Sequence, residues 1–128
     1  MIVGIGFDIV EHNLTEGLNW GSNHSPLSRI FSFKELAIYS IKKELNFLSG
    51  RFAAKEAILK CLGTGMQDGL ALPEIQILQS ESGKPIIELS GGVALISDKL
   101  EINLWHISIS HSSKYSIAFA IAEKVSTS

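Results

Sequence analysis

The sequence has little cysteine, and this scarcity excludes several kinds of site at once. A single cysteine among 128 residues rules out an internal disulfide. Cys61 also has no companion at the spacing of a zinc site, so a small residue within a helix is its simplest interpretation.

A long hydrophobic run, a basic leader and an excess of positive charge are also missing. No apolar run approaches the ~20 residues that cross a bilayer, and the opening MIVGIG lacks the basic region of a secretory signal. We therefore expect a cytoplasmic protein with no membrane partner. The net charge of −2 argues against general nucleic-acid binding, although a local basic surface is still compatible with it.

Length and hydrophobic content indicate one domain with a covered apolar surface. A chain of 128 residues holds one core and is too short for two ordinary domains, so we expect a single domain over residues 1–128. With 45% hydrophobic and only 19% charged residues, some surface is expected to be buried in a homo-oligomer.

Hydrophobic periodicity predicts strands interleaved with helices. Ser32 and Glu35 form a capping box that opens one helix, whereas residues 11–28 read as a loop with at most a short helical turn. The pattern indicates an α+β fold, in which a largely antiparallel sheet packs against a long central helix. The expected strands are 2–10, 74–78, 84–89, 105–110 and 117–121, and the expected helices are 32–43, 47–62 and 91–100.

The stretch FLSGRFAAKEAILKCLGTG, residues 47–65, reads as a helix that runs into the turn Gly63-Thr64-Gly65, and charges interrupt the apolar stripe of this helix. Lys55 falls inside the stripe and Glu56 at its edge, and alanines occupy much of the other side. Glu56 and Lys60 share a face, where they can pair with each other or hold something between them. Two interpretations stay open: a core helix with a salt bridge and a glycine cap, or a ligand site.

The strand over residues 2–10 has an apolar face and a nearly bare one. Gly4, Gly6 and Asp8 make up the bare face, which fits either a ligand site or a tightly packed strand end. Asp8 and Glu56 are the two carboxylates that the patterns single out. Two acids without a matching arginine raise each other's pKa or bind a cation, and two carboxylates are typical of Mg²⁺ held together with substrate phosphates.

The remaining polar residues complete the inventory of a phosphate-handling site. No Walker motif, dinucleotide-binding glycine pattern or Gly-x-Ser-x-Gly elbow is present in the sequence. His111 alone would more often be a turn histidine than a ligand. The candidates to be added to Asp8 and Glu56 are Lys55, Lys60, the turn Gly63-Thr64-Gly65, Lys84 and His111.

Five motifs, in order over nearly the whole chain, resemble the holo-acyl-carrier-protein synthases, which are small 4′-phosphopantetheinyl transferases. Each motif is weak alone, and together they are quite specific. The motifs are IVGIGFDIVE at residues 2–11, FLSGRFAAKEA at residues 47–57, Lys60 with Gly63–Gly65, Gly83-Lys84-Pro85, and ISISH at residues 107–111.

The resemblance implies the 4′-phosphopantetheinyl transferase fold and transfer of phosphopantetheine from coenzyme A to a serine of an apo acyl carrier protein, with release of 3′,5′-ADP. It implies Mg²⁺ on Asp8 and Glu56, and a homotrimer with active sites at subunit interfaces. Glu56, directly or through water, would take the serine proton, and Lys60 would hold the pyrophosphate or the leaving oxygen. The residues left for coenzyme A are Lys55, Gly63, Thr64 and Gly65, together with Lys84, Pro85 and His111 at the adenosine and phosphate end.

One position departs from the family pattern. Members usually carry an arginine for carrier docking about six residues after the aspartate, and here that residue is Leu14. A substitute basic surface would come from Arg29, Lys34, Lys42, Lys43 or Arg51. A non-catalytic module that binds coenzyme A or the carrier is the alternative function, although retention of both carboxylates argues against it.

Overall fold

The computed structural model describes residues 1–13, 27–42, 44–64 and 69–126, and the expected turn at 14–18 lies outside this part. The α+β class is confirmed, and the predicted strands and helices recur with ends shifted by a few residues. The elements are β1 (Ile2–Glu11), α3 (Phe33–Lys42), α4 (Leu45–Leu62), the 3₁₀ turn η2 (Leu72–Glu74), β2 (Ile75–Gln79), β3 (Pro85–Leu89), α5 (Gly91–Lys99), β4 (Leu104–His111) and β5 (Tyr115–Glu123).

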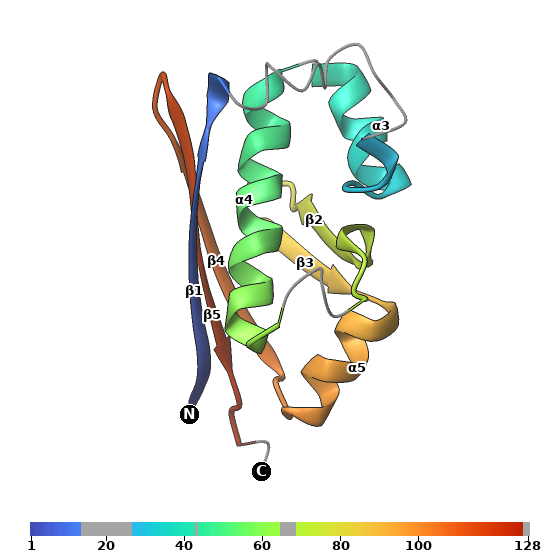
Figure 1. Ribbon diagram of the computed structural model, residues 1–128, viewed down its shortest axis with the longest axis vertical. Coiled ribbons are helices and arrows are strands. Elements are labelled where there is room, and N and C mark those ends of the chain that lie inside the picture. Colours follow the sequence, from blue (N-terminus) through green and yellow to red (C-terminus); the bar gives the residue numbers. More distant parts are fainter. Residues whose placement is uncertain (14–26, 43, 65–68, 127–128) are drawn as a thin grey trace.

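The elements form three layers with α4 in the middle (Figure 1). On one side lies a three-stranded antiparallel sheet in the order β1-β5-β4, and on the other lies the β2–β3 hairpin with α3 and α5. Because α4 is covered from both sides, Ala53, Ala54 and Ile58 are fully buried. No helix in the described part of the chain has the length and apolarity needed to span a membrane.

Glycines let β1 lie directly on α4. A Cβ placed on Gly6 would come within 1.8 Å of the Ala57 carbonyl oxygen, and one on Gly4 within 2.1 Å of the Cys61 oxygen. Strand backbone thus contacts helix backbone, which only glycine permits. Tight packing therefore explains these two glycines, and it brings Asp8, the next residue on that face, against α4.

The other face of the three-stranded sheet carries large exposed apolar side chains on β1 and β5. Ile5, Phe7 and Ile9 on β1 have exposed fractions of 56%, 48% and 52%, and Phe119 on β5 has 41%. Phe7 and Phe119 meet edge to face with ring centroids 6.2 Å apart. A contiguous group of large exposed apolar side chains marks a surface for association rather than for solvent.

Candidate active site

Asp8, Lys60 and Glu56 come together where β1 crosses α4. The Lys60 ammonium donates to Asp8 Oδ1 at 3.2 Å and to the Phe7 carbonyl at 2.8 Å. The Lys60 side chain is 53% exposed and that of Asp8 is 19% exposed. The ion pair therefore faces solvent, where its lysine can exchange one anionic partner for another.

Glu56 lies one helical turn before Lys60 and is half-buried. Burial raises the pKa of Glu56, the charge of Asp8 raises it further, and the charge of Lys60 lowers it. The two carboxylates thus repel each other across a partly dehydrated space. Such an arrangement favours either a proton or a cation between them.

The donor set fits a magnesium ion. Mg²⁺ is commonly held by one or two carboxylates and completes its coordination with water and substrate phosphates. Among the described residues there is no group of three or more histidine, cysteine, aspartate or glutamate side chains able to hold a metal, so a richer protein-only site is not formed here. Asp8 and Glu56 would supply two carboxylate ligands to the Mg²⁺ ion, and substrate phosphates and water would supply the others.

The glycine turn after α4 has a structural reason of its own. Gly63 adopts the left-handed region with φ of 71°, its N–H donates to the Lys60 carbonyl, and the Thr64 N–H donates to the Leu59 carbonyl. This is a Schellman cap, which satisfies the last carbonyls of the helix. Gly63 is exposed, and a Cβ placed on it would meet nothing within 4 Å. Gly65 lies outside the described residues.

Lys55 does not reach a ligand site in this protomer, contrary to the sequence-based assignment. Its ammonium is fully buried and donates to Glu35 Oε1 at 2.6 Å, to the Leu72 carbonyl at 3.0 Å and to the Ile75 carbonyl. An ammonium has three protons, and each has an acceptor here. Burial lowers the pKa of Lys55, and the Glu35 charge opposes that shift. The residue joins α4 to α3 and to the start of β2.

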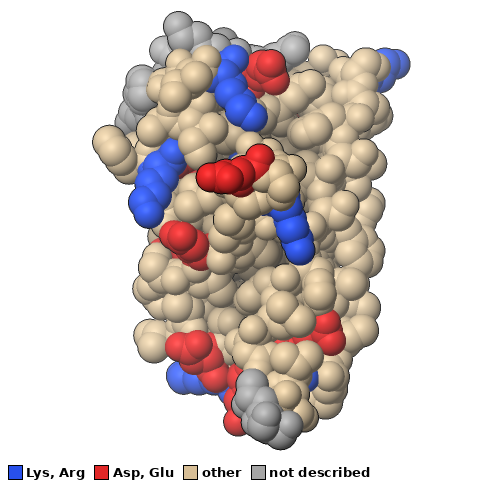
Figure 2. Space-filling model, turned by 180° about the vertical axis from the view of Figure 1, so that it is seen from behind, with Lys and Arg blue, Asp and Glu red and all other residues tan. Residues whose placement is uncertain are grey.

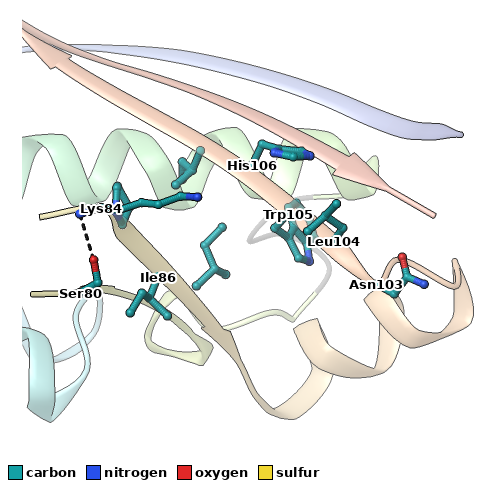
Figure 3. A pocket seen from close by; sticks show the side chains of 10 residues that line it. Ser80, Lys84, Ile86, Asn103, Leu104, Trp105 and His106 are labelled. Carbon is teal, nitrogen blue, oxygen red and sulfur yellow. Dashed lines mark hydrogen bonds between the residues drawn. The ribbon is translucent and has the colours of Figure 1, made fainter. Parts of the chain in front are cut away.

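Lys84 and Pro85 line a pocket between β3 and β4 (Figure 3). The pocket has a volume of about 530 Å³ and a mixed lining, which includes Trp105 and His106 from β4. The Lys84 side chain extends over the space between the two strands. Since β4 and β1 are the opposite edges of the sheet, this pocket and the Asp8 side chain lie at different edges of the protomer.

His111 ends β4, close to the beginning of α4. A Cβ on Gly50 would lie 2.6 Å from its Cε1, so the glycine makes room for the ring. Burial lowers the pKa of His111, and the charges of His12 and Arg51 lower it further. His111 is thus near the N-terminal end of α4, whereas Lys60 is near the C-terminal end. The protomer unites Asp8, Glu56 and Lys60, with Gly63 and Thr64 just beyond Lys60, and it leaves Lys55, Lys84, Pro85 and His111 apart from them.

Arg51 is not part of a basic surface, so that suggestion from the sequence is corrected. Its side chain is buried, its guanidinium lies 3.9 Å from the centroid of the Phe47 ring, and its Nε donates to the Ile77 carbonyl. Arg29, Lys34 and Lys42 are exposed, and Lys43 lies outside the described residues. Figure 2 shows basic and acidic side chains interspersed on one face, without an extended basic area there.

Sequence reasoning missed three residues around this region. Glu35 was identified only as a capping residue, and the hydrogen bond from Ser32 N–H to its Oε1 at 2.9 Å confirms that role. Its second role, as the partner of Lys55, had no local signal. His12 and Ser116 were not singled out, although both hydrogen-bond near His111 and both are buried. A histidine just after a strand and a serine among inward-facing alanines were the only available hints.

Comparisons with known proteins agree on one family. The model of the 4′-phosphopantetheinyl transferase superfamily matches residues 4–120. A protein of Blochmanniella pennsylvanica, named holo-[acyl-carrier-protein] synthase, is 39% identical over 97% of this chain and 100% of its own length. The crystal structure of a holo-[acyl-carrier-protein] synthase from Neisseria meningitidis aligns with a TM-score of 0.88 and 32% identity, covering 97% of this chain and 100% of that one.

A solved structure with a nucleotide also aligns over nearly the whole chain. A holo-(acyl-carrier-protein) synthase from Bacillus anthracis, in complex with CoA (3′,5′-ADP), has a TM-score of 0.81 and 34% identity, covering 98% of this chain and 99% of that one. Sequence, fold and the paired carboxylates of β1 and α4 point the same way. The chain belongs to the 4′-phosphopantetheinyl transferase superfamily.

Proposed function

We propose that this protein is a holo-acyl-carrier-protein synthase, a single-domain enzyme that transfers 4′-phosphopantetheine from coenzyme A to a serine of an apo acyl carrier protein. The observation that carries the proposal is the meeting of Asp8, Glu56 and Lys60 at one exposed place. The near full-length similarity to proteins named for this activity supports it.

In the proposed reaction the serine oxygen attacks the phosphorus that bears the pantetheine group. A new P–O bond forms, the bond to 3′,5′-ADP breaks, and the serine proton leaves. Glu56 is suited to receive this proton, directly or through water, because its half-buried carboxylate lies beside Asp8 and Lys60 where β1 meets α4. Lys60 is suited to stabilise the leaving phosphate, since its exposed ammonium is now held only by Asp8 and a backbone carbonyl in the contacts described above.

We further propose that Asp8 and Glu56 hold Mg²⁺ in the working enzyme. A bound Mg²⁺ would neutralise charge on the pyrophosphate as the bond to phosphorus breaks. Asp8 is positioned for this role because the packing of Gly4 and Gly6 on α4 brings its strand against the helix that carries Glu56. Lys60 would then exchange its contact with Asp8 for one with phosphate.

The assembly that we propose is a homotrimer with active sites between subunits. Two observations support association with a second copy: the apolar sheet face with Ile5, Phe7 and Phe119 exposed, and the separation of the carboxylates from the Lys84 pocket. If each site takes its halves from two subunits, the separation within one protomer is explained. Light scattering tests this, and a stable monomer at micromolar concentration would contradict it.

The carrier protein is proposed to dock on a basic surface near α3, because Leu14 replaces the arginine that the family usually supplies. Arg29, Lys34 and Lys42 are exposed and are the described residues available for this. Exchanging Lys34 and Lys42 together for glutamate should raise the KM for the carrier and leave the KM for coenzyme A unchanged. If the KM for the carrier is the same in this variant as in wild type, the carrier does not dock on this surface. The cytoplasm as the site of action is also a proposal, which cell fractionation tests.

Intact-mass spectrometry of an apo acyl carrier protein tests the main proposal. The carrier is incubated with this protein, coenzyme A and Mg²⁺, and parallel reactions contain EDTA, the variant Glu56→Gln, or the control Lys99→Met at the exposed end of α5. We expect one phosphopantetheine on the carrier with wild type and Lys99→Met, and none with EDTA or Glu56→Gln. Coenzyme A binding without transfer to any of several carriers would favour the non-catalytic binding module instead.

A further inference from the structure

An ion pair lies on the face of the three-stranded sheet that is turned away from α4 (Figure 1). The His106 ring on β4 and the Glu123 carboxylate on β5 meet through Nε2 and Oε1, which are 2.5 Å apart. The two residues are diagonal neighbours, because His106 is paired with Ile121 and Leu104 with Glu123. Their side chains are 50% and 25% exposed, so a further chain that packs on this face can cover them.

The polar residues of this face lie on β4 and at the end of β5, and apolar residues occupy β1 and the rest of β5. Alternation along the strands decides which residues share the face. They are Ile5, Phe7 and Ile9 on β1, Ile117, Phe119, Ile121 and Glu123 on β5, and Leu104, His106, Ser108 and Ser110 on β4. The ion pair therefore lies at the border between the apolar area and the polar edge strand.

A hollow of about 130 Å³ adjoins the ion pair. Its lining comes from two strands, with His106, Ile107 and Ser108 on β4 and Phe119 and Ile121 on β5. The small Ser108 side chain leaves this space beside the Phe119 ring, since the two residues are directly paired across the strands. The face thus has projecting apolar side chains on β1 and a depression between β4 and β5.

A second copy of this chain is the partner that this face fits. The projections and the hollow lie toward opposite edges of one face, so β1 of one copy can pack against β4 and β5 of the next in a head-to-tail contact. Such a contact also brings the strand that carries Asp8 toward the β4 edge of the next copy, where Lys84 lines its pocket. It thereby unites two groups of candidate residues that one protomer keeps apart.

We propose that His106 and Glu123 make the association of copies depend on a proton, with association strongest when the imidazole is charged. The inference rests on the assembly proposed above. The ion pair lies beside the hollow, so a copy that fills the hollow takes water away from both side chains. The protonation state of the pair then decides how much this dehydration costs.

The physical reason is the charge that the interface has to cover. A carboxylate only accepts, so His106 Nε2 carries a proton in either state of the ring. With a charged imidazole the pair is neutral overall, whereas with an uncharged imidazole it retains the negative charge of Glu123. Covering a charge that lacks a counter-ion is costly. An imidazole changes its charge between about pH 5 and 8, so association should be stronger at the acidic end of this range.

The other charged groups near His106 do not take the place of Glu123. On the side of the β2–β3 hairpin, the Lys84 side chain lines the pocket that His106 also borders, and its ammonium opposes a charged imidazole. On β1 the nearest residue of the same face is the apolar Ile5, and α4 lies against the opposite face. Lys124, which follows Glu123, is engaged in an ion pair of its own. Among these groups Glu123 is the one that favours a proton on His106.

Exchange of copies between light and heavy protein tests the proposal without any substrate. Unlabelled and ¹⁵N-labelled wild type are mixed at pH 6 and at pH 8, and native mass spectrometry follows the formation of mixed assemblies. Exchange at pH 8 should be roughly tenfold faster, because the interface then covers a carboxylate without its cation. Equal rates at the two pH values, or a protein that is monomeric at both, would overturn the proposal.

Two substitutions by glutamine assign the pH dependence to the ion pair. His106→Gln should exchange fast at both pH values, because Glu123 then never has a cation. Glu123→Gln should reverse the dependence, with slower exchange at pH 8, since an uncharged imidazole is easier to cover when no carboxylate is present. If one variant fails to fold, the other still decides the question. An undiminished pH dependence in His106→Gln would overturn the proposal.

The matched control is Ser108→Ala, which alters the same face of β4 and the same hollow without changing a charge. It should keep the pH dependence of wild type. If the dependence is lost in this control as well, packing in the hollow causes it and the ion pair does not, which would also overturn the proposal.

Transferase activity separates this inference from the function on which it rests. Transfer to an apo carrier by a protein that is monomeric at both pH values would refute the inference and leave the transferase activity established. Assemblies that exchange as expected, without transfer to any carrier, would refute the proposed function and leave the role of the ion pair intact.

Discussion

Lys55 and Lys60, five residues apart on α4, each pair with a carboxylate of another element. The surroundings of the two pairs are opposite. Lys55 pairs with Glu35 at 2.6 Å, and both side chains are 0% exposed. Lys60 pairs with Asp8 at 3.2 Å, and the side chains are 53% and 19% exposed. Each pair joins a lysine ammonium to a carboxylate, and burial and the number of hydrogen bonds distinguish the two pairs.

The comparison teaches which pair can take part in chemistry. All three protons of the buried Lys55 ammonium have acceptors within the protein, and Glu35 also accepts from the Ile77 N–H at 3.0 Å. Such a network leaves no donor for a ligand. The Lys60 ammonium is half in water and can exchange partners at low cost. We infer that the first pair stabilises the fold and the second serves the reaction.

The largest effect is expected from breaking the buried pair. Lys55→Met should lower the free energy of unfolding by about 3–5 kcal/mol, because it leaves the Glu35 carboxylate buried without its counter-ion. Urea denaturation measures this. Lys60→Met is the matched change on the same helix and should cost less than about 1 kcal/mol, since exposed ion pairs contribute little. Equal losses for the two variants would contradict the comparison.

The next effect concerns activity and falls on the exposed pair. Lys60→Met should lower kcat/KM roughly 100- to 1,000-fold, as expected when one preorganised donor to a leaving group is removed. Steady-state transfer to an acyl carrier protein measures it, with Lys99→Met as the control that retains activity. A loss of less than threefold would mean that Lys60 is not needed for the leaving group.

A smaller loss of stability is expected from substitution of Gly63, the residue that caps the C-terminal end of α4. Gly63→Ala should destabilise the fold by about 1–2 kcal/mol, because its φ of 71° is unfavourable for a side chain while the space around it is open. Gly63→Asn should cost less, since asparagine tolerates this region better. Thermal unfolding distinguishes the two variants, and equal melting temperatures for wild type and Gly63→Ala would show that strain there is unimportant.

The smallest effect is a pH-dependent gain in stability. The pKa of Glu56 is raised in the folded state, so its contribution is favourable at low pH, where it is protonated, and is lost as the pH rises through the folded-state value. In metal-free protein Glu56→Gln should therefore raise Tm by a few degrees at pH 8, with the difference shrinking as the pH falls.

Magnesium provides the control for this prediction. Adding Mg²⁺ should raise the Tm of wild type and have much less effect on Glu56→Gln, because the variant keeps only one of the two carboxylate ligands, Asp8. A lower Tm for Glu56→Gln than for wild type, in metal-free protein at pH 8, would show that the charge of Glu56 does not destabilise the folded state.

Local signals were enough to predict most of the fold. Alternation of apolar residues identified the strands, the 3.6-residue period identified α4, and Ser32 with Glu35 marked the start of α3, whose capping hydrogen bond is present. These features depend on neighbours a few residues away, which the sequence displays directly. The paired carboxylates were predicted too, because charge on a covered helix and bare backbone on a strand are visible without coordinates.

Contacts between distant segments could not be predicted in the same way. Lys55 was assigned to coenzyme A because it interrupts an apolar stripe, and only the position of Glu35 shows that it is an internal partner. Arg51 reads as a basic surface residue in the sequence and is buried against Phe47 in the structure. Periodicity tells which side of a helix is covered but not which side chain covers it.

The sequence by itself determined the elements, the family resemblance and the carboxylates Asp8 and Glu56, since these depend on residue type and short-range order. Tertiary structure alone decided which lysine is structural, which candidates share one edge of the protomer, and how His12 and Ser116 reach His111. The physical reason is that burial and hydrogen-bond direction are properties of a place in space. Residues more than a hundred positions apart, such as His12 and Ser116, acquire their chemistry only where the strands align them.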